Sequence, residues 1–430
     1  MVFQRNNFKN IVEPYIYQNL NYKQILEKLQ SYHNIKISRR QLITELQLLG
    51  LSKKQIKEAK LQKIEQIIKF HFYKGKKDKI ILLYLQQMNI NLSLNSLKKF
   101  RRQLHLSRRQ NYPDEKLVQI ILYETQNSNK YYGIRAMQHR LKVAYQIFAS
   151  RQKVRQILHE IDPEAMKLRR QKKLKRRIMH VQGPNFVWST DGYDKLRHWG
   201  FYIHGCIDAY SRYIIWLYVG TTNKRSQLIL KYYLDAIKEL KVVFLGIIPR
   251  VTRADLGVEY TLMAPVQMFF RENHNDVRAG SLSWRYGSST KAAGEWNYFD
   301  YIDRECLIFV FMPLLIQELS EFRLEWNTHR IRYDAKSRCP SGCPDDNYFL
   351  PELNHTRNFG FSVNIEDYTY IYEKFCDDPS LGEYFTVQRK SELDGIVKNI
   401  LYNIGDSKID ITNARQVYYI LRTYLHKLSV

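Results

Sequence analysis

Two short motifs, each built around an aspartate, constrain the fold of this chain more than any other feature. Residues 188–194 read WSTDGYD, with Asp191 in the middle, and residues 253–259 read RADLGVE, with Asp255 at the third position. A single aspartate at the end of a strand is most often a turn former or a helix cap. Two of them in such specific contexts indicate a pair of acids with a shared chemical role.

The residues around and between the two motifs predict a small sheet. Residues 201–208 and 212–219 are rich in β-branched and aromatic side chains, and residues 209–211 separate them as a tight hairpin turn. Residues 224–240 then place hydrophobic side chains at helical spacing, and residues 249–254 supply another short strand. The expected order is strand, hairpin, helix and strand, with an acid at the end of the first and fourth strands.

Several segments carry a family resemblance. They are residues 183–188, 191–196, 203–208, 210–212, 253–255 and 326–332, with residues 132–137, 162–164 and 348–352 further out. Together they resemble the integrase core domain proteins of eukaryotic genomes, which are relatives of retroviral integrases and of cut-and-paste transposases. The resemblance covers residues 130–351 and implies an α/β, RNase-H-like integrase core, in which flanking helices cover a mixed sheet. The core itself is expected at residues 187–351.

The resemblance also implies a reaction. Such cores cut and join DNA strands by in-line displacement at phosphorus, and two divalent ions stabilise the attacking and leaving oxygens. Mg²⁺ prefers oxygen ligands, so acids on adjacent elements can hold a pair of Mg²⁺ or Mn²⁺ ions. The residues implied as catalytic and as metal ligands are Asp191, Asp255 and Glu295.

The third acid can be placed in two registers. The family has a Ser-Thr segment, then the catalytic Glu and a pair of tryptophans, whereas this chain has Ser289 and Thr290 followed by KAAGEWNYF. Aligned without a gap, the catalytic position falls on Trp296; with a one-residue deletion it falls on Glu295. One residue turns a helical side chain by about 100°, which is enough to point a carboxylate away from the metals.

Two hypotheses of different classes therefore stay open. The first is an active, metal-dependent polynucleotidyl transferase that acts in DNA integration. The second is a domesticated or decayed protein of transposon origin, which keeps the fold and the DNA-binding parts but has lost strand transfer. In both, the expected partner is double-stranded DNA, and for the first it is the transposon ends. Joining two ends normally needs two active sites, so a homo-oligomer is also expected.

The distribution of charge supports a DNA partner. The chain has a formal net charge of +26, and residues 1–186 hold 39 Lys and Arg against 12 Asp and Glu, whereas residues 187–430 hold 29 against 30. Contacts to phosphate dominate the affinity of proteins for nucleic acids. A basic region joined to a near-neutral core is thus typical of a nucleic-acid grip attached to a catalytic module. If the chain were simply rich in lysine throughout, its excess of basic residues would not end near residue 186.

The N-terminal half repeats one pattern. Residues 34–54 recur at 89–109, and a looser third copy begins near Ser150. In each copy an apolar helix leads to a short turn and then to a serine suited to cap the next helix, so residues 1–60, 61–112 and 113–166 are each predicted to form a helix-turn-helix unit. The second helix of such a unit can enter the major groove, although three helical hairpins that only pack are the alternative. The basic residues expected to bind DNA are Arg39, Arg40, Lys98, Lys99, Arg101, Arg102, Arg151, Lys153 and Arg155.

A dense basic run precedes the core. Residues 167–186 are expected to form a linker, and eight of the eleven residues at 167–177 are basic. Such a run is typical of a phosphate clamp or of a nuclear import signal, and it favours the nucleus; a solvated linker is the alternative. The side chains predicted to contact DNA here are Lys172, Lys173, Lys175, Arg176 and Arg177.

Other features exclude classes of protein. No apolar run approaches the 18 residues of a membrane-spanning helix and no signal-peptide pattern is present, so neither a membrane nor a secreted protein is expected. Five cysteines, an odd number, argue against a disulfide framework. Residues 1–186 contain no cysteine, so the zinc domain of retroviral integrases is excluded and zinc is not expected. Helices are predicted at 307–330 and 413–428, and the C-terminal region at 352–430 receives no functional interpretation.

Overall fold

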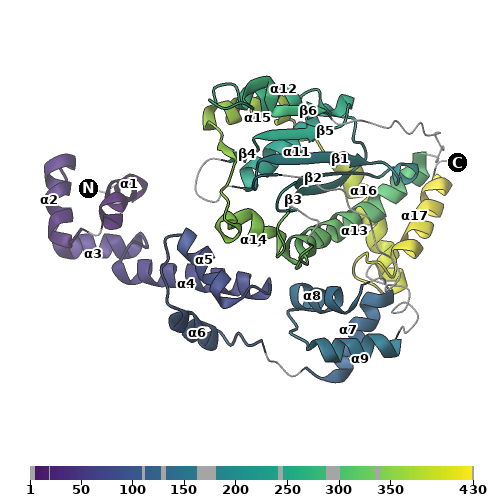
Figure 1. The fold of residues 1–430 in the computed structure, drawn as a ribbon, viewed down its shortest axis with the longest axis horizontal. Helices are drawn as coiled ribbons and strands as arrows, with labels where there is room; N and C mark the ends of the chain where they lie inside the picture. Colours follow the sequence, from purple (N-terminus) through teal and green to yellow (C-terminus); the bar gives the residue numbers. More distant parts are fainter. Residues whose placement is uncertain are drawn as a thin grey trace. The chain divides into compact units, whose positions relative to one another are not determined.

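The computed structural model describes residues 5–18, 20–108, 112–126, 132–161, 181–240, 246–286, 301–334 and 339–428. The chain divides into two compact units, Met1–Arg109 and Gln110–Val430, whose elements are labelled in Figure 1. Among the described helices, none combines the length and the apolar character that crossing a membrane would require.

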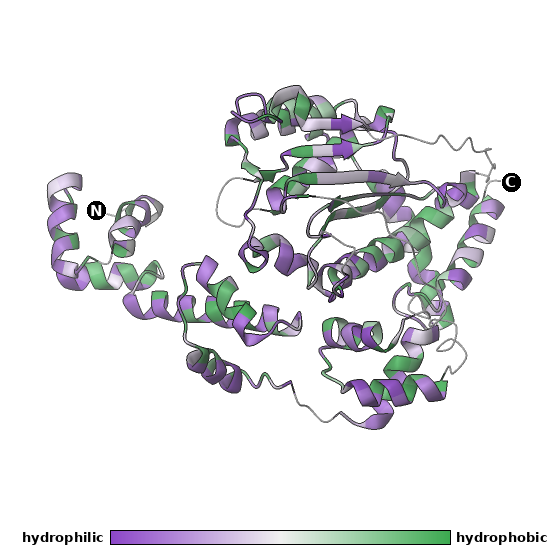
Figure 2. Cartoon of the chain, viewed as in Figure 1, coloured by the Kyte–Doolittle hydropathy of each residue, from purple (hydrophilic) through white to green (hydrophobic). Residues whose placement is uncertain are grey.

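Unit 1 is helical throughout the residues described. Its elements are α1 (Arg5–Tyr17), α2 (Tyr22–His33), α3 (Arg39–Leu48), α4 (Lys53–Tyr73), α5 (Asp78–Gln87) and α6 (Leu94–Gln103). Small clusters of aliphatic side chains hold these helices together, and Val12, Leu29 and Leu42 are fully buried in the first of them. Figure 2 shows that α6 is hydrophilic over most of its length, since little more than Leu97 faces a core.

The threefold repeat is visible in the backbone. The residue four positions before each repeated serine adopts a left-handed conformation, which asparagine tolerates better than most residues: Asn34 (φ 57°), Asn89 (φ 57°) and Gln146 (φ 58°). Each serine then accepts a hydrogen bond from the backbone N–H three residues later: Ser38, Ser93 and Ser150. The residue four positions after each serine is fully buried: Leu42, Leu97 and Val154. The prediction that these serines cap helices is confirmed.

Unit 2 begins with three further helices and continues into a sheet. The helices are α7 (Asp114–Gln126), α8 (Ile134–Tyr145) and α9 (Arg151–Ile161), and they share a core that includes Ile121, Met137 and Leu141. The sheet has the strand order β3-β2-β1-β5-β6. Its strands are β1 (Val187–Tyr193), β2 (Tyr202–Asp208), β3 (Ile214–Gly220), β5 (Val251–Ala254) and β6 (Trp284–Tyr286).

The sheet is mixed, as the sequence predicts. β1 pairs antiparallel with β2, and β2 with β3, whereas β5 runs parallel to both β1 and β6. The buried carboxylate of Asp208 organises the β2–β3 turn, because it accepts hydrogen bonds from the backbone N–H groups of Asn185 (2.7 Å) and Ser211 (2.8 Å). The predicted hairpin, helix and fourth strand are confirmed as β2–β3, α11 (Ser226–Glu239) and β5.

Helices flank this sheet. α11, α12 (Met263–Phe270) and α15 (Ile365–Cys376) contribute to one large core around Trp188, Trp216 and Tyr233. The long helix α13 (Tyr301–Thr328) lies along β3 (Figure 1). There the side chain of Asn327 accepts a hydrogen bond from the backbone N–H of Ile214 (2.7 Å) and donates one to its carbonyl (3.0 Å). α13 therefore covers the outer edge of the sheet.

The C-terminal region is part of the same unit. β7 (Phe361–Ser362) pairs with β4 (Ile247–Ile248), and α14 (Pro344–Phe349) packs against the end of α13. α16 (Val387–Ile404) and α17 (Ala414–Leu428) form a second core with α13, centred on side chains such as Val310, Leu393 and Leu421. The predicted helices at 307–330 and 413–428 are confirmed as α13 and α17. Residues 361–428 thus complete the fold around α11 and α13.

A buried histidine makes the stability of unit 2 depend on pH. His204 is 1% exposed on β2; Trp216 Nε1 donates to its Nδ1 (3.0 Å), and its Nε2 lies 3.2 Å from the hydroxyl of Tyr260. Burial lowers the pKa of His204 to about 3. Between that value and the unfolded pKa of about 6.5, the unfolded chain binds more protons than the folded one. Protonation therefore favours unfolding, by about 2 kcal/mol between pH 6.5 and pH 5 from this group alone.

The measurement is denaturant unfolding of the wild type and His204→Gln at several pH values. Wild-type stability should fall relative to the variant as the pH is lowered from 6.5 to 5. Asp208→Asn gives the opposite control: burial raises the pKa of Asp208 to about 6, so the folded state gains a proton that the unfolded state lacks, and wild-type stability should rise relative to this variant as the pH falls from 6 towards 4. If the stability of the wild type and of His204→Gln changed equally with pH, the lowered pKa of His204 would be contradicted.

Candidate functional site

The sheet brings Asp191 and Asp255 to the same level on neighbouring strands. In the parallel pairing of β1 with β5, Ser189 lies opposite Arg253. Side chains two residues apart in a strand lie on the same face, so Asp191 and Asp255 follow this pair on one face, where both strands reach their carboxyl ends. On the other side of β1, Asp191 faces Gly205 of β2, which has no side chain to cover it.

The electrostatics of the pair favour a cation. Partial desolvation raises the pKa of the Asp191 carboxyl, and the nearby carboxylates of Asp255 and then Asp194 raise it further. The Oδ1 atom of Asp255 is buried and has no hydrogen-bond donor among the residues described. A buried polar atom without a partner is costly, and a hard divalent cation is the ligand that carboxylate oxygens of this kind bind. The residues present therefore fit Mg²⁺ or Mn²⁺.

Two further acids, neither of them among the predicted ligands, belong to this cluster. Asp194 accepts a hydrogen bond from Asn223 Nδ2 (2.7 Å). Burial raises the pKa of Glu259, as do Asp255 and Asp194. The Glu259 carboxylate lies over Gly257, where a Cβ would come within 2.3 Å of it, so the glycine leaves room for the acid. Asp194 and Glu259 each lie inside one of the two aspartate motifs, and this position was the sequence feature that could have identified them.

The third predicted ligand, Glu295, lies outside the described residues. The same holds for Lys172, Lys173, Lys175, Arg176 and Arg177 of the basic run. The described part of the chain therefore contains two of the three predicted metal ligands, and it brings these two together.

Most of the other predicted DNA-binding side chains are exposed. They lie on α3 (Arg39, Arg40), α6 (Lys98, Lys99, Arg102) and α9 (Arg151, Arg155). Two are engaged in ion pairs instead: Arg101 with Asp78, at 2.7 Å between Nη1 and Oδ2, and Lys153 with Asp114. The guanidinium of Arg101 also lies over the ring of Phe72. In this structure Arg101 therefore stabilises unit 1.

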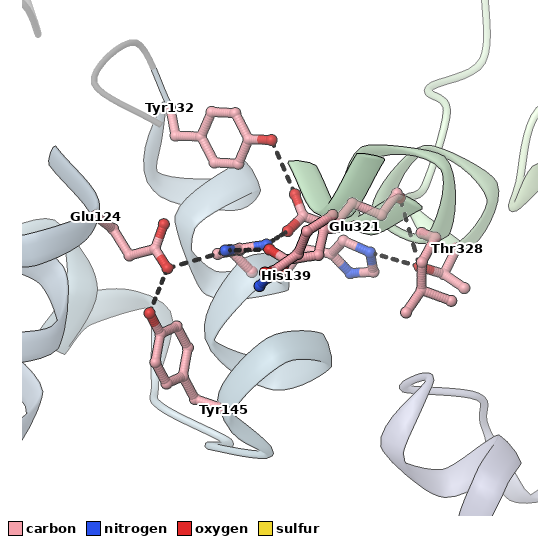
Figure 3. A network of polar contacts seen from close by, with 10 residues as sticks. Glu124, Tyr132, His139, Tyr145, Glu321 and Thr328 are labelled. Carbon is pink, nitrogen blue, oxygen red and sulfur yellow. Dashed lines mark hydrogen bonds and ion pairs between the residues drawn. The ribbon is translucent and has the colours of Figure 1, made fainter. Parts of the chain in front are cut away.

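A buried ionic network ties α8 to α13 (Figure 3). Arg140 of α8 donates to Glu124 of α7 (Nε to Oε1, 3.0 Å) and pairs with two acids of α13, Glu325 (Nη1 to Oε1, 2.6 Å) and Glu321 (Nη2 to Oε2, 2.7 Å). We refer to these four side chains as the Arg140 network. The side chains of Arg140, Glu124 and Glu325 are only 12%, 2% and 9% exposed.

Hydrogen bonds complete this junction. The hydroxyl of Tyr145 donates to Glu124 (2.5 Å), and that of Tyr132 donates to Glu325 (2.8 Å). His139 Nε2 lies 2.9 Å from Thr328 Oγ1 (Figure 3). Because every buried charge here has a partner, the helices α7 to α9 are fixed against the sheet-bearing part of unit 2.

One further group could hold a metal. Among the described residues, Cys343, Asp345 and Asp346 each offer a ligand atom within 4.8 Å of the others. These residues begin α14 (Pro344–Phe349), where acids stabilise the first turn by interacting with the helix dipole. This interaction with the helix dipole accounts for the positions of Asp345 and Asp346 without a metal.

Residues 178–283 match the family model of the integrase core domain. The match spans β1 to β5 and includes Asp191, Asp255 and Glu259. A comparison with curated protein sequences gives no match.

Proposed function

We propose that this protein, which contains an integrase core domain of RNase-H-like fold at residues 178–283, cuts and joins DNA strands by metal-dependent polynucleotidyl transfer. One observation carries the proposal: Asp191 and Asp255 lie on one face near the carboxyl ends of two neighbouring parallel strands, and a buried oxygen of Asp255 has no hydrogen-bond donor among the described residues. The charge of Asp255 raises the proton affinity of the Asp191 carboxylate, and a bound cation would relieve that repulsion.

Asp191, Asp255 and Glu295 would hold two Mg²⁺ or Mn²⁺ ions. When bound, such a pair supplies an activated water or 3′ hydroxyl and stabilises the charge on the leaving oxygen. The protein's own contribution is to fix the two aspartates on adjacent strands. Arg253 is exposed two residues before Asp255, on the same face of β5, where its guanidinium can bind a phosphate of the DNA.

The proposed substrate is double-stranded DNA, at the ends of a transposon, bound by a homo-oligomer. The exposed cations of α3, α6 and α9 support a DNA grip, since phosphate contacts supply most of the affinity for nucleic acids. We further propose that residues 167–177 direct the protein to the nucleus. Deletion of these residues should abolish nuclear accumulation of a fluorescent fusion, and unchanged accumulation would contradict this role.

A second candidate function is DNA binding without strand transfer. The family match ends at residue 283, twelve positions before Glu295, and Glu295 aligns with the catalytic position only through a one-residue deletion. A helix turned by about 100° at this point would leave the fold and the basic surfaces intact but deprive the metals of their third ligand.

Nicking of supercoiled plasmid by the full chain separates the two candidates. The active protein should nick DNA with Mg²⁺ and not with EDTA, and Glu295→Gln should lower the rate by at least about 100-fold, as loss of a metal ligand does. Glu259→Gln is the comparison, because this acid also lies near Asp255. DNA binding without any nicking would favour the second candidate, and absence of DNA binding would reject both.

A further inference from the structure

Unit 2 contains a large pocket between α8–α9 and the end of α13. Its volume is about 1020 Å³; the lining residues of one wall lie within 132–151, and those of the other lie within 322–333 and include Ser341. Four arginines line it: Arg135 of α8, Arg151 at the start of α9, and Arg330 and Arg332, which follow α13. We refer to this site as the arginine pocket.

The four guanidinium groups have no acidic ion-pair partner among the described residues. In the described part of the chain, no carboxylate forms an ion pair with Arg135, Arg151, Arg330 or Arg332. Their mutual repulsion is evident, because Arg332 lowers the pKa of Arg135 most strongly, ahead of desolvation, Arg151 and Arg330. The lining acid Glu325 is already bound by Arg140 and Tyr132. A cluster of uncompensated arginines on two facing walls is arranged to bind an anion.

Exposed aromatic rings lie beside these arginines. Phe322 is 43% exposed and Tyr333 is 80% exposed, and both line the pocket. Trp326 is held in the wall by a hydrogen bond from its Nε1 to the carbonyl of Arg212 (2.8 Å). Binding of a free phosphate would not require aromatic rings. The bases of an unpaired nucleic-acid strand, in contrast, stack on exposed aromatic side chains while arginines bind the backbone.

We propose that the arginine pocket binds an unpaired DNA strand, with phosphates on the four arginines and a base against Phe322 or Tyr333. This inference rests on the proposed function in requiring DNA as the ligand. The two walls come from helices and core segments that the Arg140 network joins, so the pocket is formed before DNA arrives. The helices α8 and α9 and the integrase core then bind one strand together.

The test measures binding of the full chain to two fluorescent DNAs, a blunt duplex and the same duplex with a single-stranded extension, over a range of salt concentrations. The wild type should bind the extended duplex more tightly. Arg330→Ala/Arg332→Ala should weaken that binding roughly tenfold or more and reduce the salt slope by about 1.4, the value for two phosphates of a single strand. Tyr333→Ala should weaken binding of the extended duplex alone, by about tenfold.

Two further variants make the test specific. Arg135→Ala/Arg151→Ala removes charge from the opposite wall and should be non-additive with Arg330→Ala/Arg332→Ala, because both walls bind one strand. Lys390→Ala/Lys398→Ala removes the same charge from exposed positions of α16 and should change affinity by less than roughly threefold, since distant charges are screened. All these side chains are exposed, so melting temperatures should stay at the wild-type value.

The outcomes are distinguishable. If the wild type binds neither DNA, the proposed function fails and this inference fails with it. If the wild type binds DNA but the pocket variants behave like the α16 control, only the arginine pocket is rejected. Equal losses on both DNAs with no effect of Tyr333→Ala would assign the pocket to duplex phosphates and overturn the unpaired strand. Displacement of the DNA by inorganic phosphate at constant ionic strength would assign it to free phosphate instead.

Discussion

Replacement of Arg140 by alanine should lower the free energy of unfolding of unit 2 by about 3–5 kcal/mol. The guanidinium lies among Glu124, Glu321 and Glu325, and the first and last of these are almost completely buried. Without Arg140, the carboxylates of Glu124 and Glu325 would remain in a region of low dielectric without their cation, although each still accepts a hydrogen bond from a tyrosine hydroxyl. Denaturant unfolding at neutral pH would measure the loss.

The pH dependence of this variant should identify the cause. Burial already raises the pKa of Glu325 when Arg140 is present, and loss of the arginine should raise it further. The folded variant would then take up protons that the unfolded chain does not, so its deficit relative to the wild type should shrink as the pH is lowered. A deficit that stays constant with pH would point to lost packing instead.

Lys153→Ala is the matched control. Lys153 pairs with Asp114 in the same group of helices, but these side chains are 35% and 66% exposed. Water already solvates both charges, so the loss should stay below about 1 kcal/mol. Equal effects of the two substitutions would contradict the view that burial makes the Arg140 network important.

The local elements of this fold could be predicted because their signals lie within a few residues. Ser38 and Ser93 cap helices in the places that their spacing indicates. The two aspartates were predicted as a pair because each ends a run of strand-forming residues, and the parallel register of β1 and β5 places them side by side. Because side chains alternate between the two faces of a strand, both aspartates lie on the same face of the sheet.

Contacts between distant segments could not be predicted in this way. Arg140 and Glu325 are 185 positions apart, and nothing around either residue in the sequence indicates the other. The arginine pocket has the same origin, since Arg135 and Arg332 become neighbours only when α8 packs against α13. Glu259 shows a different limit: its motif was visible, but only the fold shows its carboxylate above Gly257 and near Asp255.

Asp191→Asn should abolish Mg²⁺-dependent nicking, with a loss of at least about 100-fold, while leaving the fold and DNA binding unchanged. The substitution keeps the shape of the side chain and removes only the charge that a cation needs. Asp191 is an exposed residue two positions before the end of β1, so little packing depends on it. Nicking that persists in this variant would exclude Asp191 as a metal ligand.

The melting temperature tests metal binding at the same site without depending on catalysis. A metal that binds only the folded state raises the melting temperature, so Mg²⁺ should stabilise the wild type and have no such effect on Asp191→Asn. Without metal, the variant should be at least as stable as the wild type, because the raised pKa of Asp191 shows that its charged form is disfavoured, by desolvation and then by Asp255. Asp394→Asn, at an exposed position of α16, is the control for a lost charge elsewhere. Stabilisation of the wild type by Mg²⁺ without nicking would mean that the two aspartates still bind metal and that the defect lies at the third ligand.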